Sequence, residues 1–337
     1  MAAVACTLSL LAGCTAKLDS AEEGAISFSA GSALLRDDAT KTGTPKTGTT
    51  FSEGDAFLAW GWHDAANQYI RFGTSSAVTL GSNGLWDYAP HQFWNWMGSG
   101  DFYDFLAIYP ANADITPFEA TLGNSNLKAI VTYVPTETQY DLMAAGYRRT
   151  DRAVDIVSLT FSHLLSAVSL EVKNSAVSID SNGDPLTITL KSCRFINLIT
   201  SSDIKVTFDG TTLGVTNVSN TISDTPVLGP SIPANTTLAP GSRYPIEDVW
   251  DIMVPQDLNS QGNLQIEFNK GGEDITETIA LKDIKKENAP LETISSWEAG
   301  MKYHYKIELC FGVGIIVTVK TTPWEEVEAE TPGIQIQ

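Results

Sequence analysis

The sequence predicts an all-β fold made of two tandem β-sandwiches. Short runs in which apolar and polar residues alternate recur along the chain, and this period of two is typical of strands with one buried face. Turn signals such as Ser181–Asp184 and Asp209-Gly210 separate the runs, and helical patterns are nearly absent. The 337 residues exceed the usual size of one domain, and a hydrophobic content of 43% supports substantial cores.

The N-terminus has the features of an export signal. Val4–Leu11 is an apolar run too short to span a bilayer, and small residues follow it. Leu11–Cys14 resembles a bacterial lipobox, in which Cys14 is lipidated and becomes the first residue of the mature chain. The other interpretation is an ordinary secretory signal that ends near a cysteine. We expect residues 1–13 to be a lipoprotein signal peptide, with contact to a membrane only through the lipid.

The first sandwich is expected over residues 14–150. It begins with a short alternating strand at Ile26 and Phe28, and Phe57–Trp62 is an apolar run consistent with a strand buried on both faces. Between them, residues 29–50 are rich in Gly, Ser, Thr and Lys and predict an exposed loop. This loop offers three accessible basic sites of the kind that trypsin-like proteases cut, namely Arg36, Lys41 and Lys46.

The segment from Leu85 to Pro110 is dense in aromatic residues and has two interpretations. Exposed aromatic rings stack well on sugars, so Trp86, Trp94 and Trp96 are candidate glycan contacts. Large aromatic side chains are mostly buried, which favours a segment that closes one end of a sandwich core.

The domain boundary is expected between residues 150 and 151, within the charged link Arg148–Asp155. Beyond it, Val157 and Phe161 hold one parity of the strand pattern, whereas Val168 and its apolar neighbours hold the other. This change at His163–Leu164 predicts a bulge or tight turn.

The second sandwich is expected over residues 151–337. Its clearest alternation, Tyr303–Phe311, leads directly into a C-terminal strand. In that strand Val313, Ile315, Val317 and Val319 share one face, and Pro323 ends it because proline has no N–H for a ladder. Such a strand can complete its own domain or be lent to a neighbouring molecule.

Composition and motifs argue against several functional classes. A net charge of −19 and a pI near 4.5 disfavour nucleic acid as a partner. The four histidines show no metal-ligand spacing, and no nucleophile or phosphate-binding motif is present, so we expect no enzyme activity, metal or cofactor. Cys193 and Cys310 lie on predicted strands as a disulfide or as two buried thiols.

Taken in order, several stretches resemble the fimbrillin family, the pilins and accessory proteins of the type V fimbriae of Gram-negative anaerobes. Together they cover nearly the whole chain. They are the lipobox Leu11–Cys14, FSEGD at Phe51–Asp55, the aromatic segment ending at Pro110, DLMAA at Asp141–Ala145, LTFSHLLSAVSLEV at Leu159–Val172, VPQDL at Val254–Leu258, WEAGMKYHYKIEL at Trp297–Leu309 and VTVKTTPW at Val317–Trp324.

The resemblance implies two transthyretin-like β-sandwich domains, lipid-mediated transit to the outer membrane, and assembly with other fimbrial subunits on the cell surface. It also implies that a trypsin-like protease removes the first strand, here Ile26–Phe28, by cutting after Arg36 or else Lys41. The C-terminal strand of the next subunit then fills the groove, through donor residues Ile315, Val317, Val319 and Trp324.

The resemblance leaves the position in a fimbria open. The tail after Trp324 carries four glutamates, so there are two interpretations: a stalk subunit, or an accessory, anchor or tip subunit. The alternative function is a surface lipoprotein that binds glycan through Trp86, Trp94 and Trp96 without forming filaments.

Overall fold

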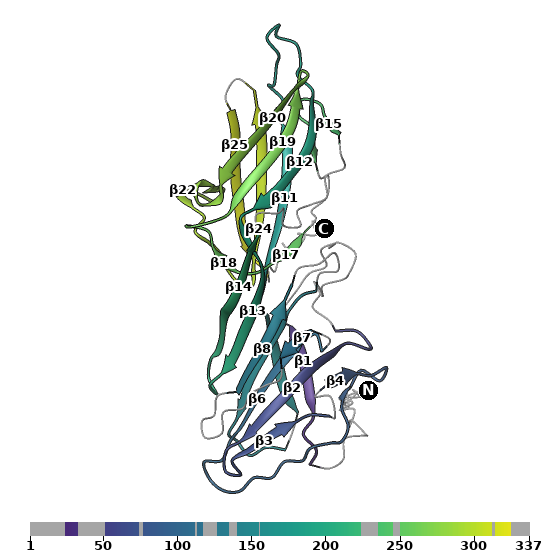
Figure 1. Cartoon of the computed structure of the whole chain (residues 1–337). Coiled ribbons are helices and arrows are strands. Elements are labelled where there is room, and N and C mark those ends of the chain that lie inside the picture. The colour runs from purple at the N-terminus through teal and green to yellow at the C-terminus, as the bar shows by residue number, and fades with distance from the viewer. Residues whose placement is uncertain are drawn as a thin grey trace, which may run out of the picture.

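The computed structural model describes residues 24–32, 51–73, 77–111, 113–116, 127–134, 140–154, 156–223, 235–244, 250–311 and 314–324. These residues form strands and one short 3-10 helix, Leu281–Asp283, in an elongated molecule (Figure 1). The predicted all-β class is therefore confirmed. The lipidation candidate Cys14 and the cleavage candidates Arg36 and Lys41 lie outside the described residues.

The N-terminal half contains a ring of strands. The sheet has the order β3-β2-β4-β5-β1-β10-β9-β6, and β2 also pairs with β6. Seven of its strands therefore form a closed ring, and β3 lies outside the ring, paired with β2. The strands are β1 (Phe28–Ser32), β2 (Ala56–His63), β3 (Gln68–Arg71), β4 (Ala77–Leu80), β5 (Trp86–Asp87), β6 (Tyr103–Tyr109), β9 (Met143–Arg149) and β10 (Val157–His163).

A second sheet covers one side of this ring. It has the order β14-β13-β8-β7, with β7 at Asp114–Thr116, β8 at Leu127–Tyr133, β13 at Leu198–Phe208 and β14 at Leu213–Ser223. Alternate residues of β2, β6 and β9 face either the ring interior, as Phe105 does, or the second sheet, as Leu106 does. Two separate cores result, which explains why β2 and β6 are buried on both faces.

The two layers approach closely at Gly146 of β9. A Cβ atom at this position would lie 2.2 Å from the ring of Phe208 on β13. Since no side chain fits there, glycine is what allows Phe208 to pack into the core between the layers.

The C-terminal half is built from two sheets that enclose one core. One sheet runs β16-β11-β24-β25-β21-β22 with β17 beside β11, the other runs β15-β12-β19-β20, and β18 and β23 form a separate pair. The bounds are β11 (Ser166–Asn174), β12 (Ile188–Ile196), β15 (Thr236–Leu238), β16 (Arg243–Tyr244), β17 (Asp251–Met253), β18 (Gln256–Asp257), β19 (Asn263–Lys270), β20 (Glu273–Ala280), β21 (Lys285–Lys286), β22 (Ala289–Thr293), β23 (Ser296–Trp297), β24 (Met301–Cys310) and β25 (Gly314–Pro323).

Two long runs of chain pass between the halves. β10 belongs to the ring and β11 to the C-terminal sheet, and the chain changes sheets at Leu164–Leu165, beside the predicted parity change. Likewise β12 belongs to the C-terminal half and β13 to the second N-terminal sheet, with Asn197 at φ 56° between them. A cut at the predicted boundary, 150/151, would separate β10 and the hairpin β13–β14 from the sheets in which they pair. The division into two domains stays a prediction.

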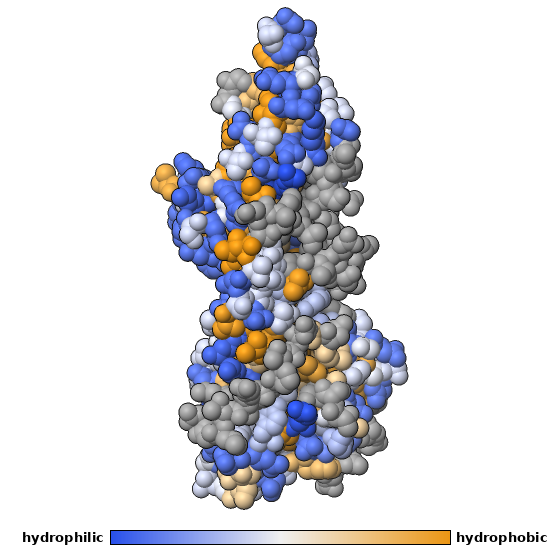
Figure 2. All heavy atoms as spheres, viewed as in Figure 1, coloured by the Kyte–Doolittle hydropathy of each residue, from blue (hydrophilic) through white to orange (hydrophobic). Residues whose placement is uncertain are grey.

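Cys193 and Cys310 are both free and buried. Burial raises the pKa of the Cys193 thiol to about 12. The structure thus favours the interpretation as buried thiols. On the face shown in Figure 2, hydrophilic residues cover most of the described surface, and hydrophobic residues lie in separate small groups.

Candidate functional site around the first strand

The first strand, β1, is paired much more extensively on one edge than on the other. On one side β1 runs parallel to β10, with register pairs from Phe28↔Val157 to Ser32↔Phe161. On the other side it pairs with β5 only at Phe28↔Trp86. One edge of β1 is therefore held along its length, whereas the other is held at a single position.

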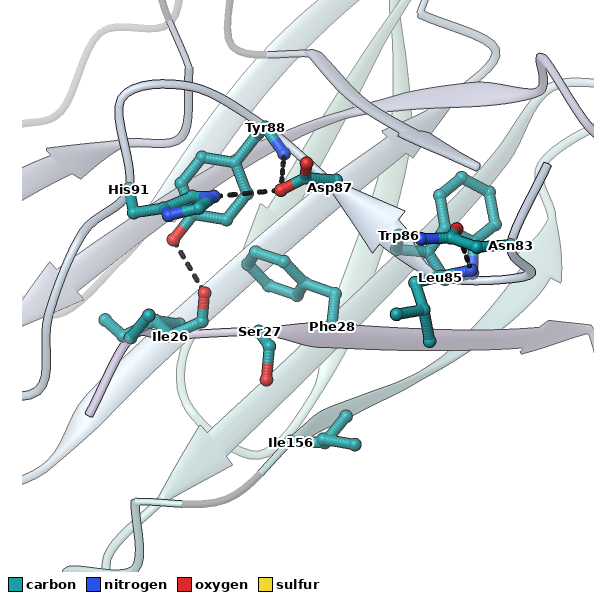
Figure 3. A pocket seen from close by; sticks show the side chains of 11 residues that line it. Ile26, Ser27, Phe28, Asn83, Leu85, Trp86, Asp87, Tyr88, His91 and Ile156 are labelled. Carbon is teal, nitrogen blue, oxygen red and sulfur yellow. Dashed lines mark hydrogen bonds and ion pairs between the residues drawn. The ribbon is translucent and has the colours of Figure 1, made fainter. Parts of the chain in front are cut away.

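The residues before β1 are held by the aromatic segment instead. The Ile26 N–H donates to the Gln92 carbonyl at 2.8 Å, and the Trp94 N–H donates to the Gly24 carbonyl at 3.0 Å. The Tyr88 hydroxyl donates to the Ile26 carbonyl at 2.6 Å, as Figure 3 shows. Residues 24–26 thus gain a partner on the side where β5 offers little.

Side chains of β1 and of Ile26, two residues before it, fill the ring interior. Ile26 and Phe28 are 1% and 4% exposed. The Phe28 ring lies 4.9 Å from Phe72 and 5.9 Å from both Phe57 and Tyr88, measured between centroids. Burial of a side chain of this size contributes roughly 1.5–3 kcal/mol. Loss of the strand would therefore open an apolar groove inside the ring.

A cavity lies on the weakly paired side of the strand. It has a volume of about 190 Å³, and Phe28, Trp86, Tyr88 and Ile156 contribute apolar walls (Figure 3). Among its other lining residues, the His91 Nε2 lies 2.9 Å from the Asp87 carboxylate. Burial raises the pKa of Tyr88 to about 12, so its hydroxyl stays protonated as a donor to Ile26.

The candidate glycan residues pack against other rings. Trp94 and Trp96 stack in parallel at 5.5 Å, and Trp96 meets Tyr103 edge-on at 4.9 Å. Trp86 contacts Phe57 at 4.7 Å. All three are partly buried against the ring core. Each of the three indoles thus contacts other aromatic rings of the N-terminal half, and their role as glycan contacts stays a prediction.

Three of the predicted donor residues, Ile315, Val317 and Val319, pack in their own half of the molecule, whereas Trp324 packs in the other half. β25 pairs with β24 along its whole length and with β21 through Thr318 and Val319. Val319 is fully buried, and Ile315 and Val317 pack against the C-terminal core from partly buried positions. Trp324 is 3% exposed and packs in the core between the N-terminal layers.

Two buried histidine–carboxylate pairs were not anticipated from the sequence. His163 Nδ1 lies 2.6 Å from Asp141, close to Trp324. His63 Nε2 lies 2.8 Å from Asp101. Burial alone would raise the pKa of Asp101, but hydrogen bonds from the Met97 and Ala65 N–H groups and from His63 bring it below its ordinary value. The pair therefore anchors the aromatic segment, at Asp101, to β2.

The part of the chain that the structure describes holds no cluster of three or more residues suited to a metal ion. Among the same residues, no helix has the length and apolar character needed to cross a membrane.

Comparison with solved structures finds similar architecture in several bacterial proteins. A candidate cell adhesion protein from Parabacteroides distasonis is 8% identical, with coverage of 91% of this chain and 98% of that one and a TM-score of 0.51. A candidate cell adhesion protein from Bacteroides uniformis is 18% identical (90% and 100% covered, TM-score 0.49). A fimbrilin from Porphyromonas gingivalis is 11% identical (89% and 99% covered, TM-score 0.42). No curated protein matches the chain.

The family comparison covers most of the chain. The model of the fimbrillin-like family matches residues 40–324, which include every strand described here except β1. Proteins of this kind are structural components of cell-surface appendages and not enzymes. The chain belongs to the fimbrillin-like family.

Proposed function

We propose that this chain is a fimbrial subunit that joins other subunits by exchanging β1 for a strand of a neighbour. The observation that carries the proposal is the position of β1 in the ring, with full pairing to β10 and a single register pair to β5. Loss of the strand leaves an apolar groove and unpaired backbone groups on both sides, and an incoming strand satisfies both.

A protease cut supplies the trigger in this proposal. Arg36 is the first candidate and Lys41 the second, and both lie between β1 and Phe51, where the described chain resumes. A cut there separates β1 from the rest of the chain. After the cut only noncovalent contacts hold β1, so a competing strand can replace it.

The donor segment is proposed within residues 315–327. Ile315, Val317 and Val319 would supply the apolar face, and Trp324 would follow them. In the structure β25 pairs within its own half and Trp324 packs in the core between the N-terminal layers, so donation requires β25 to leave β24 and β21 and Trp324 to leave that core. A head-to-tail contact of this kind generates an open filament.

Export and surface placement complete the proposal. Cys14 would carry the lipid through which the precursor reaches the outer membrane, and the assembled subunit would contribute to adhesion. The similar structure of a candidate cell adhesion protein from Parabacteroides distasonis supports this role.

The experiment is limited trypsin treatment of the exported protein. We expect a cut near Arg36 or Lys41 and then an SDS-resistant ladder of oligomers, absent in a variant with Arg36→Gln, Lys41→Gln and Lys46→Gln. A synthetic peptide of residues 24–32, added in excess, should occupy the groove and suppress the ladder, whereas the same peptide with Phe28→Asp should not. Clipped protein that stays monomeric would disprove assembly by strand exchange.

The donor is tested separately from the acceptor. Val317→Asp leaves the protease cut and the acceptor groove unchanged, but it places a charge on the proposed donor face. We expect this variant to accept the peptide and yet form no ladder. A normal ladder from the folded variant would exclude β25 as donor and leave the acceptor groove standing.

A further inference from the structure

The edge strand β14 is unlike the other sheet edges that the structure describes. It is eleven residues long, and β13 is its ladder partner among the described residues. Its exposed aliphatic side chains are Val215 (38%), Val218 (51%) and Ile222 (55%). The strand contains neither a charged residue nor a proline, which are the usual means of blocking an edge.

The other described edges carry such protection or are short. β20 carries Glu273, Asp274 and Glu277, and β22 carries Pro290 and Glu292. β3, β7, β15 and β16 have between two and four residues. Because unprotected long edges pair with other strands, the lack of protection at β14 singles it out as an interaction surface.

Charge selects the partner. The chain carries a net charge of −19, so two copies repel each other wherever acidic surfaces meet. A strand that matches β14 in length and brings no like charge to the contact avoids this repulsion, and among the described edge strands β14 itself is long, uncharged and exposed. We propose that β14 pairs antiparallel with β14 of a second copy, about a two-fold axis.

The register of this pairing follows from the strand. Val218 is the middle residue of Leu213–Ser223, and it is also the extra residue of a bulge, since Asn217 pairs with Ile204 and Ser219 with Asp203. With full overlap of the two strands, the axis passes through Val218. The bulges then face each other, and each half of one strand pairs with the other half of its partner.

This contact is distinct from the head-to-tail exchange of β1. It joins subunits side by side through the hairpin β13–β14, which Figure 1 shows along the outer edge of the molecule. It also needs no protease cut, so it can be tested in the intact chain, independently of strand exchange.

The test is sedimentation of the intact protein over a concentration series. We expect a reversible dimer that strengthens with salt, because salt screens the repulsion between two acidic chains. Val218→Lys should weaken the dimer roughly tenfold or more, because it sets two like charges against each other at the axis. Leu291→Lys is the control, since Leu291 is 97% exposed on edge strand β22 and should leave the dimer unchanged.

A cross-link fixes the register. The two cysteines among the described residues, Cys193 and Cys310, are buried, so in a chain that also carries Cys6→Ser and Cys14→Ser the Val218→Cys change adds the accessible thiol, and oxidised glutathione should link two copies through it. Leu291→Cys should not give this product. A chain that stays monomeric throughout, or a dimer that Val218→Lys does not weaken, would overturn the proposal.

Discussion

The indole of Trp324 lies flat on the imidazole of His163, with centroids 4.3 Å apart and planes inclined by 4°. His163 ends β10 of the ring, and Trp324 directly follows β25 of the C-terminal half. The backbone N–H of Trp324 also donates to the Gly300 carbonyl, and the backbone N–H of Gly300 donates to the Leu165 carbonyl. The end of the C-terminal strand is therefore fastened where the chain passes from one half to the other.

Trp324→Ala should destabilise the protein by about 3–5 kcal/mol, because it removes a large side chain from a packed core. Lys320→Ala, at an exposed position of the same strand, should change the free energy of unfolding by less than about 0.5 kcal/mol. Denaturant titration of both variants checks this. If Trp324→Ala lowers the free energy of unfolding by less than about 1 kcal/mol, the contacts of Trp324 contribute little to stability.

Gly146→Ala should destabilise the N-terminal half, because its Cβ would collide with the Phe208 ring at 2.2 Å. Overpacking of this kind typically costs about 1–3 kcal/mol. The collision makes a second prediction. In the Phe208→Ala background the ring is gone, so the added Gly146→Ala change should cost little, and a double-mutant cycle by chemical denaturation measures the difference.

Tyr88→Phe should loosen residues 24–26, because it removes the hydroxyl that donates to the Ile26 carbonyl. The expected loss is about 1 kcal/mol. Hydrogen exchange should report faster opening of the Ile26 amide, while β24 stays unchanged. Tyr303→Phe makes the same chemical change in the other half, where the hydroxyl accepts from the Glu298 N–H, and should leave Ile26 unaffected.

Asp209 should titrate at about 2, below the value near 3.9 of an unfolded chain. Hydrogen bonds from the Thr212 and Thr211 N–H groups and from the Thr211 hydroxyl lower this pKa by favouring the carboxylate. Because the folded pKa is depressed, the turn is held fully above pH 3.9 and loosens as pH falls towards 2. NMR titration measures the pKa, and Thr211→Ala should raise it part of the way back.

Local pattern was sufficient to predict the clearest alternating strand and a break in the strand pattern, although it predicted a bulge or tight turn there and not a change of sheet. The alternation in Tyr303–Phe311 matches β24, and the parity change at His163–Leu164 lies at the crossing from β10 to β11. Both features can be predicted from neighbouring residues, because odd or even position along a strand decides which face of the sheet a side chain lies on.

Such patterns could not predict the arrangement around β1. The pairing of β2 with β6 closes the ring, and hydrogen bonds join Gln92 and Trp94 to residues 24–26. Both connect segments that are far apart in sequence. The same holds for the pairing of β13 with β8, which ties the second half of the chain to the first. Apolar periodicity gives the buried face of a strand but not the identity of its neighbour.

The run from β12 through Asn197 to β13 has a mechanical consequence. Its first part is paired with β19 in the C-terminal half and its second part with β8 in the N-terminal half, and Figure 1 shows it running roughly along the long axis. A tensile force that pulls the halves apart along this axis loads both ladders in shear. Their hydrogen bonds must then yield together and not one after another, which suits a subunit that carries tension.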